Sequence, residues 1–133
     1  MVAPLAVTAL GLGLGTGTAG AVLKSRTDSF TFRNPSGAQV TCTVQSAHDL
    51  ADDGSLTVST TLSGPVECTA SFMDIGVEYR HRSTGEADSA YQESSGTSLS
   101  YSIDDVAAPV RSEHLVLLDA CDCLYLYELR QSK

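Results

Sequence analysis

Apolar and polar residues alternate with a period of two along most of the chain. In the run over 56–62, Leu56, Val58 and Leu62 share one parity, and serine or threonine occupies every remaining position. A period of two places successive side chains on opposite faces of a strand, whereas an amphipathic helix repeats every 3.6 residues. Because no window sustains the helical period, the pattern predicts short β-strands throughout.

Turn-forming residues separate these runs. Asn-Pro-Ser-Gly follows the alternating pair Phe30 and Phe32, and Gly64-Pro65 ends the run that contains Leu62. About seven to eight short strands at this spacing are typical of antiparallel sandwiches. We therefore expect an all-β fold, a small antiparallel β-sandwich that is Ig-like or related and is stabilised by disulfides.

The parity of the apolar positions changes once, at Met73-Asp74. Apolar residues are even-numbered over 66–72 and odd-numbered over 75–79. An extra residue in one strand of a pair, a β-bulge, shifts parity in this way, as does a corner between two sheets. We expect such an irregularity within a strand that begins near Val66.

The N-terminal segment has the character of an export signal. The first 23 residues carry no charged side chain, and Val2 to Leu14 is rich in Leu, Ala, Val and Gly. Ala19-Gly20-Ala21 fits the small-x-small pattern before a signal-peptidase cut, although the usual basic residues before the apolar stretch are missing. We predict a signal peptide over 1–21, a single β-sandwich domain over 22–133 and a secreted, extracellular protein. The apolar stretch is too short and too rich in Gly and Thr to predict a stable membrane span.

The chain is acidic, with 16 Asp and Glu residues against 8 Lys and Arg residues and a net charge of −8. Affinity for nucleic acid comes largely from basic side chains that neutralise phosphates, and anionic membranes attract the same side chains. The charge therefore disfavours both partners and is typical of an extracellular protein kept in solution by its charge.

The even number of cysteines predicts disulfides in a small exported domain. On one extended strand, Cys121 and Cys123 would point to the same face with Cα atoms about 6.5–7 Å apart, near the upper limit for a bridge. We therefore expect each of them to bridge to Cys42 or Cys68, which requires the C-terminal strand to lie in the interior of a sheet.

An alternative pairing depends on a turn. Asp119 and Asp122 suit turn positions, so the segment over 119–122 would join the two arms of a hairpin. Cys121 would then close on Cys123 and leave Cys42 to pair with Cys68.

Metal and cofactor sites have little support. Cys121 and Cys123 with His114 would offer two thiolates and an imidazole, but their spacing matches no standard zinc pattern and an oxidising compartment consumes thiols. The acidic segment over 49–53 lacks the alternate spacing of an EF-hand loop and has the composition of a turn. We expect no metal and no cofactor.

The three histidines, His48, His81 and His114, accompany no Gly-x-Ser-x-Gly elbow, and disulfides leave no cysteine nucleophile. His48 and His81 flank expected turns and should be solvated, and His114 begins the last apolar run at an expected strand end. We therefore expect no enzymatic activity and assign no catalytic residue.

The longest polar stretch, from Arg82 to Ser98, contains Tyr91 as its only large apolar residue. An aromatic residue among Ser, Gly, Gln and Glu is typical of an adaptable binding surface. We expect a mobile loop that contributes to any interaction surface through Arg82, Glu86, Asp88, Tyr91, Gln92 and Glu93.

These features predict a secreted, non-enzymatic binding protein of the cell envelope or extracellular medium, whose partner is an unidentified protein or cell-envelope component. The alternative is a secreted hydrolase or a hydrolase (proteinase) inhibitor. An enzyme would need a concave pocket with a histidine and carboxylates of perturbed pKa. A binding protein would present exposed aromatic side chains on a flat or convex face.

Overall fold

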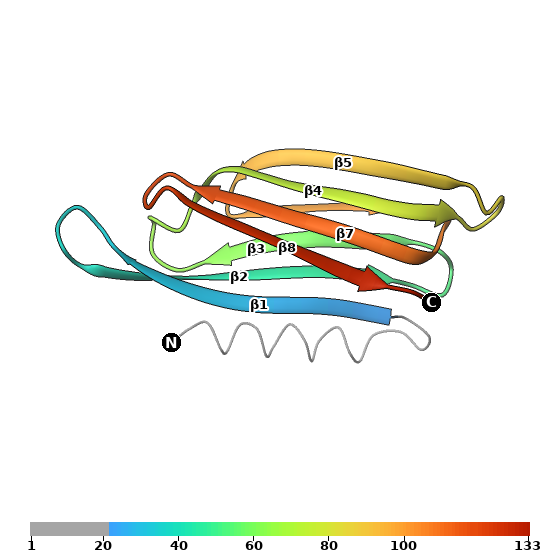
Figure 1. Ribbon diagram of the computed structural model, residues 1–133, viewed down its shortest axis with the longest axis horizontal. Helices are drawn as coiled ribbons and strands as arrows, with labels where there is room; N and C mark the ends of the chain where they lie inside the picture. The colour runs from blue at the N-terminus through green and yellow to red at the C-terminus, as the bar shows by residue number, and fades with distance from the viewer. Residues whose placement is uncertain (1–21) are drawn as a thin grey trace.

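The computed structural model describes residues 22–133, which form two antiparallel sheets of four strands each (Figure 1). The expected all-β fold is confirmed, and within this part of the chain no helix is long and apolar enough to cross a membrane. The predicted signal peptide over 1–21 lies outside the described residues. The eight strands are β1 (Val22–Arg33), β2 (Gln39–Leu50), β3 (Leu56–Ser63), β4 (Ala70–His81), β5 (Ala87–Gly96), β6 (Ser98–Ile103), β7 (Val106–Leu118) and β8 (Cys123–Gln131).

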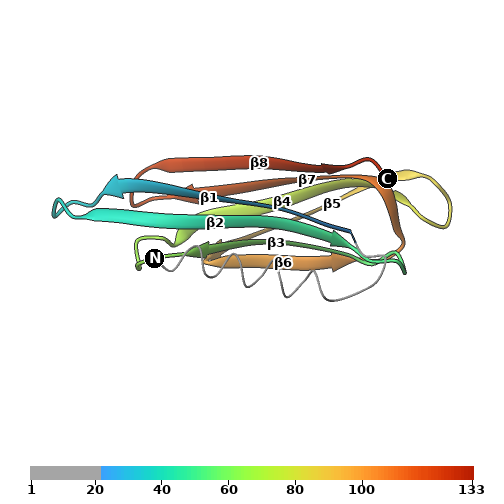
Figure 2. The same cartoon turned by 90° about the horizontal axis from the view of Figure 1, so that it is seen from below.

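The strand order is β1-β2-β3-β6 in sheet A and β5-β4-β7-β8 in sheet B. The chain passes between the sheets after β3, β5 and β6, and Figures 1 and 2 show the edge strands β1 and β8 side by side. β2 and β3 form a hairpin within one sheet, whereas the second and third strands of an immunoglobulin domain lie in different sheets. The sandwich therefore has two layers, as an immunoglobulin domain does, but a different strand order.

The core lies between the sheets and follows from the period-two alternation. Leu56 and Val58 point inward from β3, and Ile75, Val77 and Val116 point inward from sheet B. Burying one such aliphatic side chain stabilises the fold by about 1.5–3 kcal/mol. This apolar layer therefore holds the two sheets together.

The expected irregularity in the fourth strand is confirmed, because the pairing of β4 with β5 shifts register between Ala70 and Met73. Ala70 and Met73 are both buried although they lie three positions apart, whereas regular alternation buries residues an even number of positions apart. One extra residue in β4 between them accounts for the difference. The strand begins at Ala70, so the expectation of a strand from Val66 is wrong. Gly64, with a φ of 139°, and Pro65 open a turn instead, and Val66 is 84% exposed.

The structure contains two disulfides, Cys42–Cys68 and Cys121–Cys123, with Cα–Cα distances of 5.6 Å and 5.1 Å. The expected crossed bridges are therefore wrong, and the alternative pairing is the observed one. The reason is a local turn, because Asp122 has a φ of 53° and its N–H donates to the carbonyl oxygen of Asp119. The chain bends between the two cysteines, which brings their Cα atoms closer than in an extended strand.

The expectation of an interior C-terminal strand is also wrong, because β8 is an edge strand that pairs only with β7. Apolar side chains lie on both faces of β8, but only one of these faces is covered by the opposite sheet. Tyr125 and Tyr127 lie opposite Val116 and His114 of β7, whose side chains point into the sandwich. The intervening Leu124 and Leu126 point outward into solvent.

The expected loop over 82–98 is wrong for most of its length. Residues 87–96 form β5, which pairs with β4 at the other edge of sheet B, and β6 begins at Ser98. Nearly all side chains of β5 are exposed, on both faces of the strand. Its composition therefore resembles that of a loop although its backbone is extended and paired.

Candidate functional site

Four large apolar side chains are exposed in residues 22–133, and three of them lie on the outer face of sheet B. Tyr91 on β5 is 55% exposed, while Leu124 and Leu126 on β8 are 63% and 53% exposed. The fourth is Val66, in the turn before β4. Exposed apolar groups that gather on one face mark interaction sites, whereas single ones are ordinary.

The strand register joins the two exposed leucines to half-buried neighbours. Leu124 lies opposite Leu117, which in turn lies opposite Phe72, and Leu126 lies opposite Leu115. Directly opposed residues in an antiparallel sheet point to the same face with Cβ atoms about 4.5–5.5 Å apart. We call the resulting continuous surface the apolar patch, made of Phe72, Leu115, Leu117, Leu124 and Leu126.

Carboxylates border the apolar patch. Asp74 lies opposite Leu115, and Glu93 lies opposite Asp74 in the next strand. Glu113 and Glu128 form an opposed pair in the adjoining part of β7 and β8. The patch therefore presents aliphatic side chains beside negative charge.

Tyr91 is held in place on the same face. It lies opposite Gly76, and a Cβ on that glycine would stand 3.8 Å from Cδ1 of the tyrosine ring, an ordinary contact. The ring thus covers a strand position that has no side chain of its own. The hydroxyl of Tyr91 donates to Oδ2 of Asp74 at 2.9 Å, and this hydrogen bond is the main reason why the pKa of Tyr91 rises to about 12.

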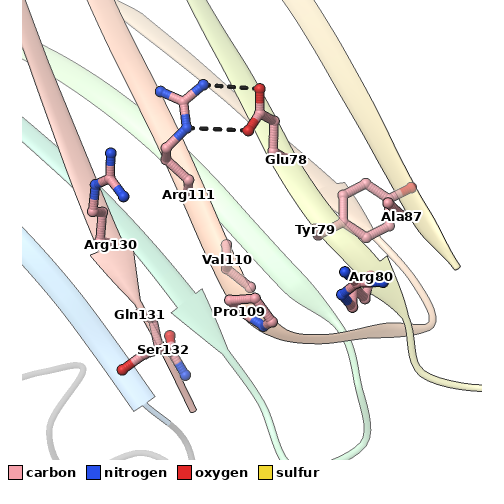
Figure 3. A pocket seen from close by; sticks show the side chains of 10 residues that line it. All are labelled: Glu78, Tyr79, Arg80, Ala87, Pro109, Val110, Arg111, Arg130, Gln131 and Ser132. Atoms are coloured by element: carbon pink, nitrogen blue, oxygen red, sulfur yellow. Dashed lines mark hydrogen bonds and ion pairs between the residues drawn. The ribbon is translucent and has the colours of Figure 1, made fainter. Parts of the chain in front are cut away.

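Basic side chains occupy the other end of this face, around an open cleft of about 490 Å³ (Figure 3). Arg111 donates from Nε and Nη2 to the two carboxylate oxygens of Glu78, at 3.2 and 2.8 Å, and thereby lowers the pKa of Glu78. Arg80 donates to the carbonyl oxygen of Gly85 at 2.9 Å, and Arg130 pairs with Glu128. Three of the chain's eight basic residues therefore line one cleft, and two of them, Arg111 and Arg130, pair with carboxylates of the same face.

The outer face of sheet A has a different character. Ser29 and Thr43 hydroxyl oxygens lie 3.1 Å apart, and those of Thr31 and Thr41 lie 3.0 Å apart, so hydroxyl pairs connect β1 to β2. None of the four exposed large apolar residues lies on this face. The outer face of sheet B is therefore the better candidate for binding.

Only two of the residues predicted for an interaction loop, Tyr91 and Glu93, lie on this face. The others have the opposite parity on β5 or lie in the turn before it: Arg82, Glu86, Asp88 and Gln92. Leu124 and Leu126 were missed, although residues 123–127 are apolar at both parities. That run was interpreted as a strand in the interior of a sheet.

A hydrogen-bonded chain of polar side chains crosses the interior. Ser112 Oγ lies 2.8 Å from Nδ1 of His48 and 2.9 Å from Nε2 of His114, and Thr60 Oγ1 lies 2.8 Å from Nδ1 of His114. All four residues are completely buried, so the expectations of a solvated His48 and of His114 at a strand end are wrong. A serine between two histidines has the atoms of a nucleophile and its base, but no substrate reaches it here.

Burial also sets the charge of these histidines. It lowers the pKa of His114 to about 4, with a smaller contribution from His48. It lowers the pKa of His48 as well, although the side chain of Gln131 acts in the opposite direction. Both rings are therefore neutral at pH 7, and the network is a structural link between the sheets.

His81 differs from the expectation of a free, solvated ring. Its Nε2 lies 2.8 Å from Asp88 and its Nδ1 lies 3.3 Å from Asp105, and both hydrogen bonds raise its pKa. The Asp105 carboxylate also accepts from the N–H and hydroxyl of Ser83. This cluster fixes the turn between β4 and β5.

No group of three or more His, Cys, Asp or Glu side chains within 22–133 is placed to hold a metal ion. The acidic segment over 49–53 ends β2 and enters the expected turn, in which Oδ1 of Asp53 accepts from the N–H of Ser55 at 2.9 Å. The pKa of Asp53 is lowered mainly by the hydrogen bond from the hydroxyl of Ser55 and, to a smaller extent, by this hydrogen bond from its N–H.

The chain matches no protein-family model, no curated protein and no solved structure. The functional argument therefore rests on the geometry of the outer face of sheet B.

Proposed function

We propose that this protein is an exported, non-enzymatic binding protein that contacts a protein or a cell-envelope component through the outer face of sheet B. The observation that carries the proposal is the gathering of Tyr91, Leu124 and Leu126 on one face. A flat sheet face with an aliphatic centre and a charged border has the anatomy of an interaction surface, in which apolar area supplies affinity and the border supplies selectivity.

The border defines the chemistry of the partner. Asp74 lies beside Leu115 and Glu93 lies beside Asp74, whereas Glu113 and Glu128 pair with Arg111, and the chain as a whole has a net charge of −8. A partner that offers exposed aliphatic or aromatic groups flanked by Lys or Arg complements this surface. Electrostatic attraction would then accelerate association and weaken as salt is added.

Two further observations support an exported protein without enzymatic activity. Both disulfides are typical of proteins from an oxidising compartment. The only serine in contact with two histidines, among residues 22–133, is Ser112, which has no exposed surface.

The experiment is an affinity capture from the native culture medium or envelope extract, followed by measurement of affinity for the captured partner. Leu124→Ser with Leu126→Ser should lower that affinity by at least about tenfold, because loss of two well-buried apolar contacts costs more than 1.4 kcal/mol. Val66→Ser removes another exposed apolar side chain, outside this face, and should change nothing. Equal losses for the double variant and the control would contradict the proposal.

A further inference from the structure

The four edge strands of the sandwich differ in how they are protected against pairing with another chain. Natural edge strands are usually short, carry charges or proline, or contain a bulge. β6 has six residues, and the pairing of β5 with β4 contains the register shift described above. On β1, Lys24, Arg26 and Asp28 take the parity that points into the sandwich.

β8 has none of these protections in its first half. Residues 123–127 contain no charge and no proline, and their pairing with β7 is regular. The sequence is Cys-Leu-Tyr-Leu-Tyr, rich in residues that favour strands. The free edge of β8 is therefore an open template for one more strand.

A second copy of β8 fits this edge in one antiparallel register. With Leu126 on a twofold axis, Leu126 faces its own copy, and residues 123–129 of the two strands pair. Because the axis repeats every contact, every other contact forms twice. On the inner face, Tyr125 lies opposite Tyr127 of the second copy, again twice, and aromatic cross-strand pairs stabilise antiparallel sheets.

Neighbouring registers are worse. An axis at Tyr125 pairs only residues 123–127, because β8 begins at Cys123, and an axis at Glu128 places that carboxylate opposite its own copy. An axis at Tyr127 places Leu126 opposite Glu128 and replaces the two Tyr125–Tyr127 contacts by a single contact of Tyr127 with its own copy. In the favoured register Glu128 faces Leu124, but its charge is already matched by Arg111 and Arg130 of its own chain.

The tyrosines are already oriented for this contact. The hydroxyl of Tyr125 donates to Asp28 at 2.9 Å, and the guanidinium of Arg26 lies 4.5 Å from the centre of the Tyr127 ring. Arg26 also donates to the hydroxyl of Tyr127 at 3.1 Å. These contacts with β1 hold both rings on the inner side and leave the backbone edge of β8 free, so little side-chain ordering remains to be done on pairing.

We propose that two copies of this protein pair through β8 in the register centred on Leu126, which joins the two B sheets into one continuous eight-stranded sheet. The two apolar patches then meet across the axis on one face. This pairing goes beyond the proposed function and does not depend on it, since the outer face stays open in either state.

A cysteine pair tests the register directly. Leu126→Cys places two thiols directly opposite each other, with Cβ atoms about 4.5–5.5 Å apart, so mild oxidation should link the two chains. Leu124→Cys is the matched control, because its copies would stand about 13 Å apart along the strands and should stay unlinked. Equal cross-linking of both variants, or of neither, overturns the proposed register.

Oligomeric state tests the pairing itself. Sedimentation of the unmodified protein should show a dimer that dissociates on dilution, and Leu126→Lys should raise its dissociation constant by at least about tenfold, because two like charges then face each other. Val66→Lys, at another exposed apolar site that lies off the sheet, should leave the dimer unchanged. A chain that stays monomeric up to about 1 mM overturns the proposal, while a monomer that still binds the captured partner leaves the proposed function standing.

Discussion

Ser112 Oγ lies 2.8 Å from Nδ1 of His48, although the two residues belong to strands of different sheets. Ser112 has a single hydroxyl proton and also contacts His114. It therefore donates to one ring and accepts from the other, so both histidines carry the same tautomer: Nε2–H if Ser112 donates to His48, and Nδ1–H if it donates to His114. The contact gives the sandwich a polar link between its two sheets, and stability should depend on it.

We expect stability to fall on mild acidification. The pKa of His114 is about 4 in the folded chain and 6.5 in the unfolded one, so between these values the unfolded state binds more protons. Stability is therefore full above pH 6.5 and decreases towards pH 4, by about 2 kcal/mol between pH 7 and pH 5 from His114 alone. Urea unfolding at both pH values measures this.

The control for acidification is His81→Asn. The pKa of His81 is raised, so its contribution has the opposite sign and is lost as pH rises through the folded pKa. The variant should therefore still lose stability between pH 7 and pH 5, as the parent does, because that loss comes from His114. Equal stability of the parent at pH 7 and pH 5 would contradict the burial of neutral histidines.

We expect Ser112→Ala to destabilise the protein by about 2–4 kcal/mol. The change leaves Nδ1 of His48 and Nε2 of His114 without their partner, and a buried unpaired polar group costs about 1–3 kcal/mol. Ser100→Ala on the exposed outer face of sheet A is the control, with an expected change within about 0.5 kcal/mol. Denaturant midpoints at pH 7 compare the two, and equal values would refute the link.

The two disulfides should contribute unequally to stability. On the chain-entropy model, Cys42–Cys68 closes a loop with a sequence separation of 26 and stabilises by about 3.5 kcal/mol, whereas Cys121–Cys123, with a separation of 2, gives under about 2 kcal/mol. Paired serine substitutions measure both. Peptide mapping of unreduced protein checks the connectivity, and any peptide that links Cys42 to Cys121 or Cys123 would disprove it.

We expect Asp74→Asn to lower the pKa of Tyr91 from about 12 towards 10, since the hydrogen bond to Asp74 is the largest cause of the shift. An NMR titration of the tyrosine ring carbons measures the change. Asp28→Asn is the matched control, because Asp28 bonds Tyr125 and should leave Tyr91 unaffected. A Tyr91 pKa that ignores Asp74→Asn would mean that the ring is not tethered on the outer face.

The sequence alone determined the local structure. Period-two alternation at Leu56, Val58 and Leu62 identified a strand, and the parity change at Met73-Asp74 identified the irregularity in β4. These features depend on residues close together in the chain, because side-chain direction in a strand is set by the pleat. The even cysteine count likewise identified disulfides but not their partners.

Only the tertiary structure decided which strands are edges and which polar residues are buried. Leu124 and Leu126 have the composition of an interior strand, and Tyr91 lies in a stretch with the composition of a loop, yet both segments are edge strands of sheet B. His48 follows a strand pattern near a turn and is nevertheless buried by β7 of the opposite sheet. Alternation reports which side chains share a face, but strand neighbours and the covering sheet depend on contacts between residues far apart in the chain, which no local pattern encodes.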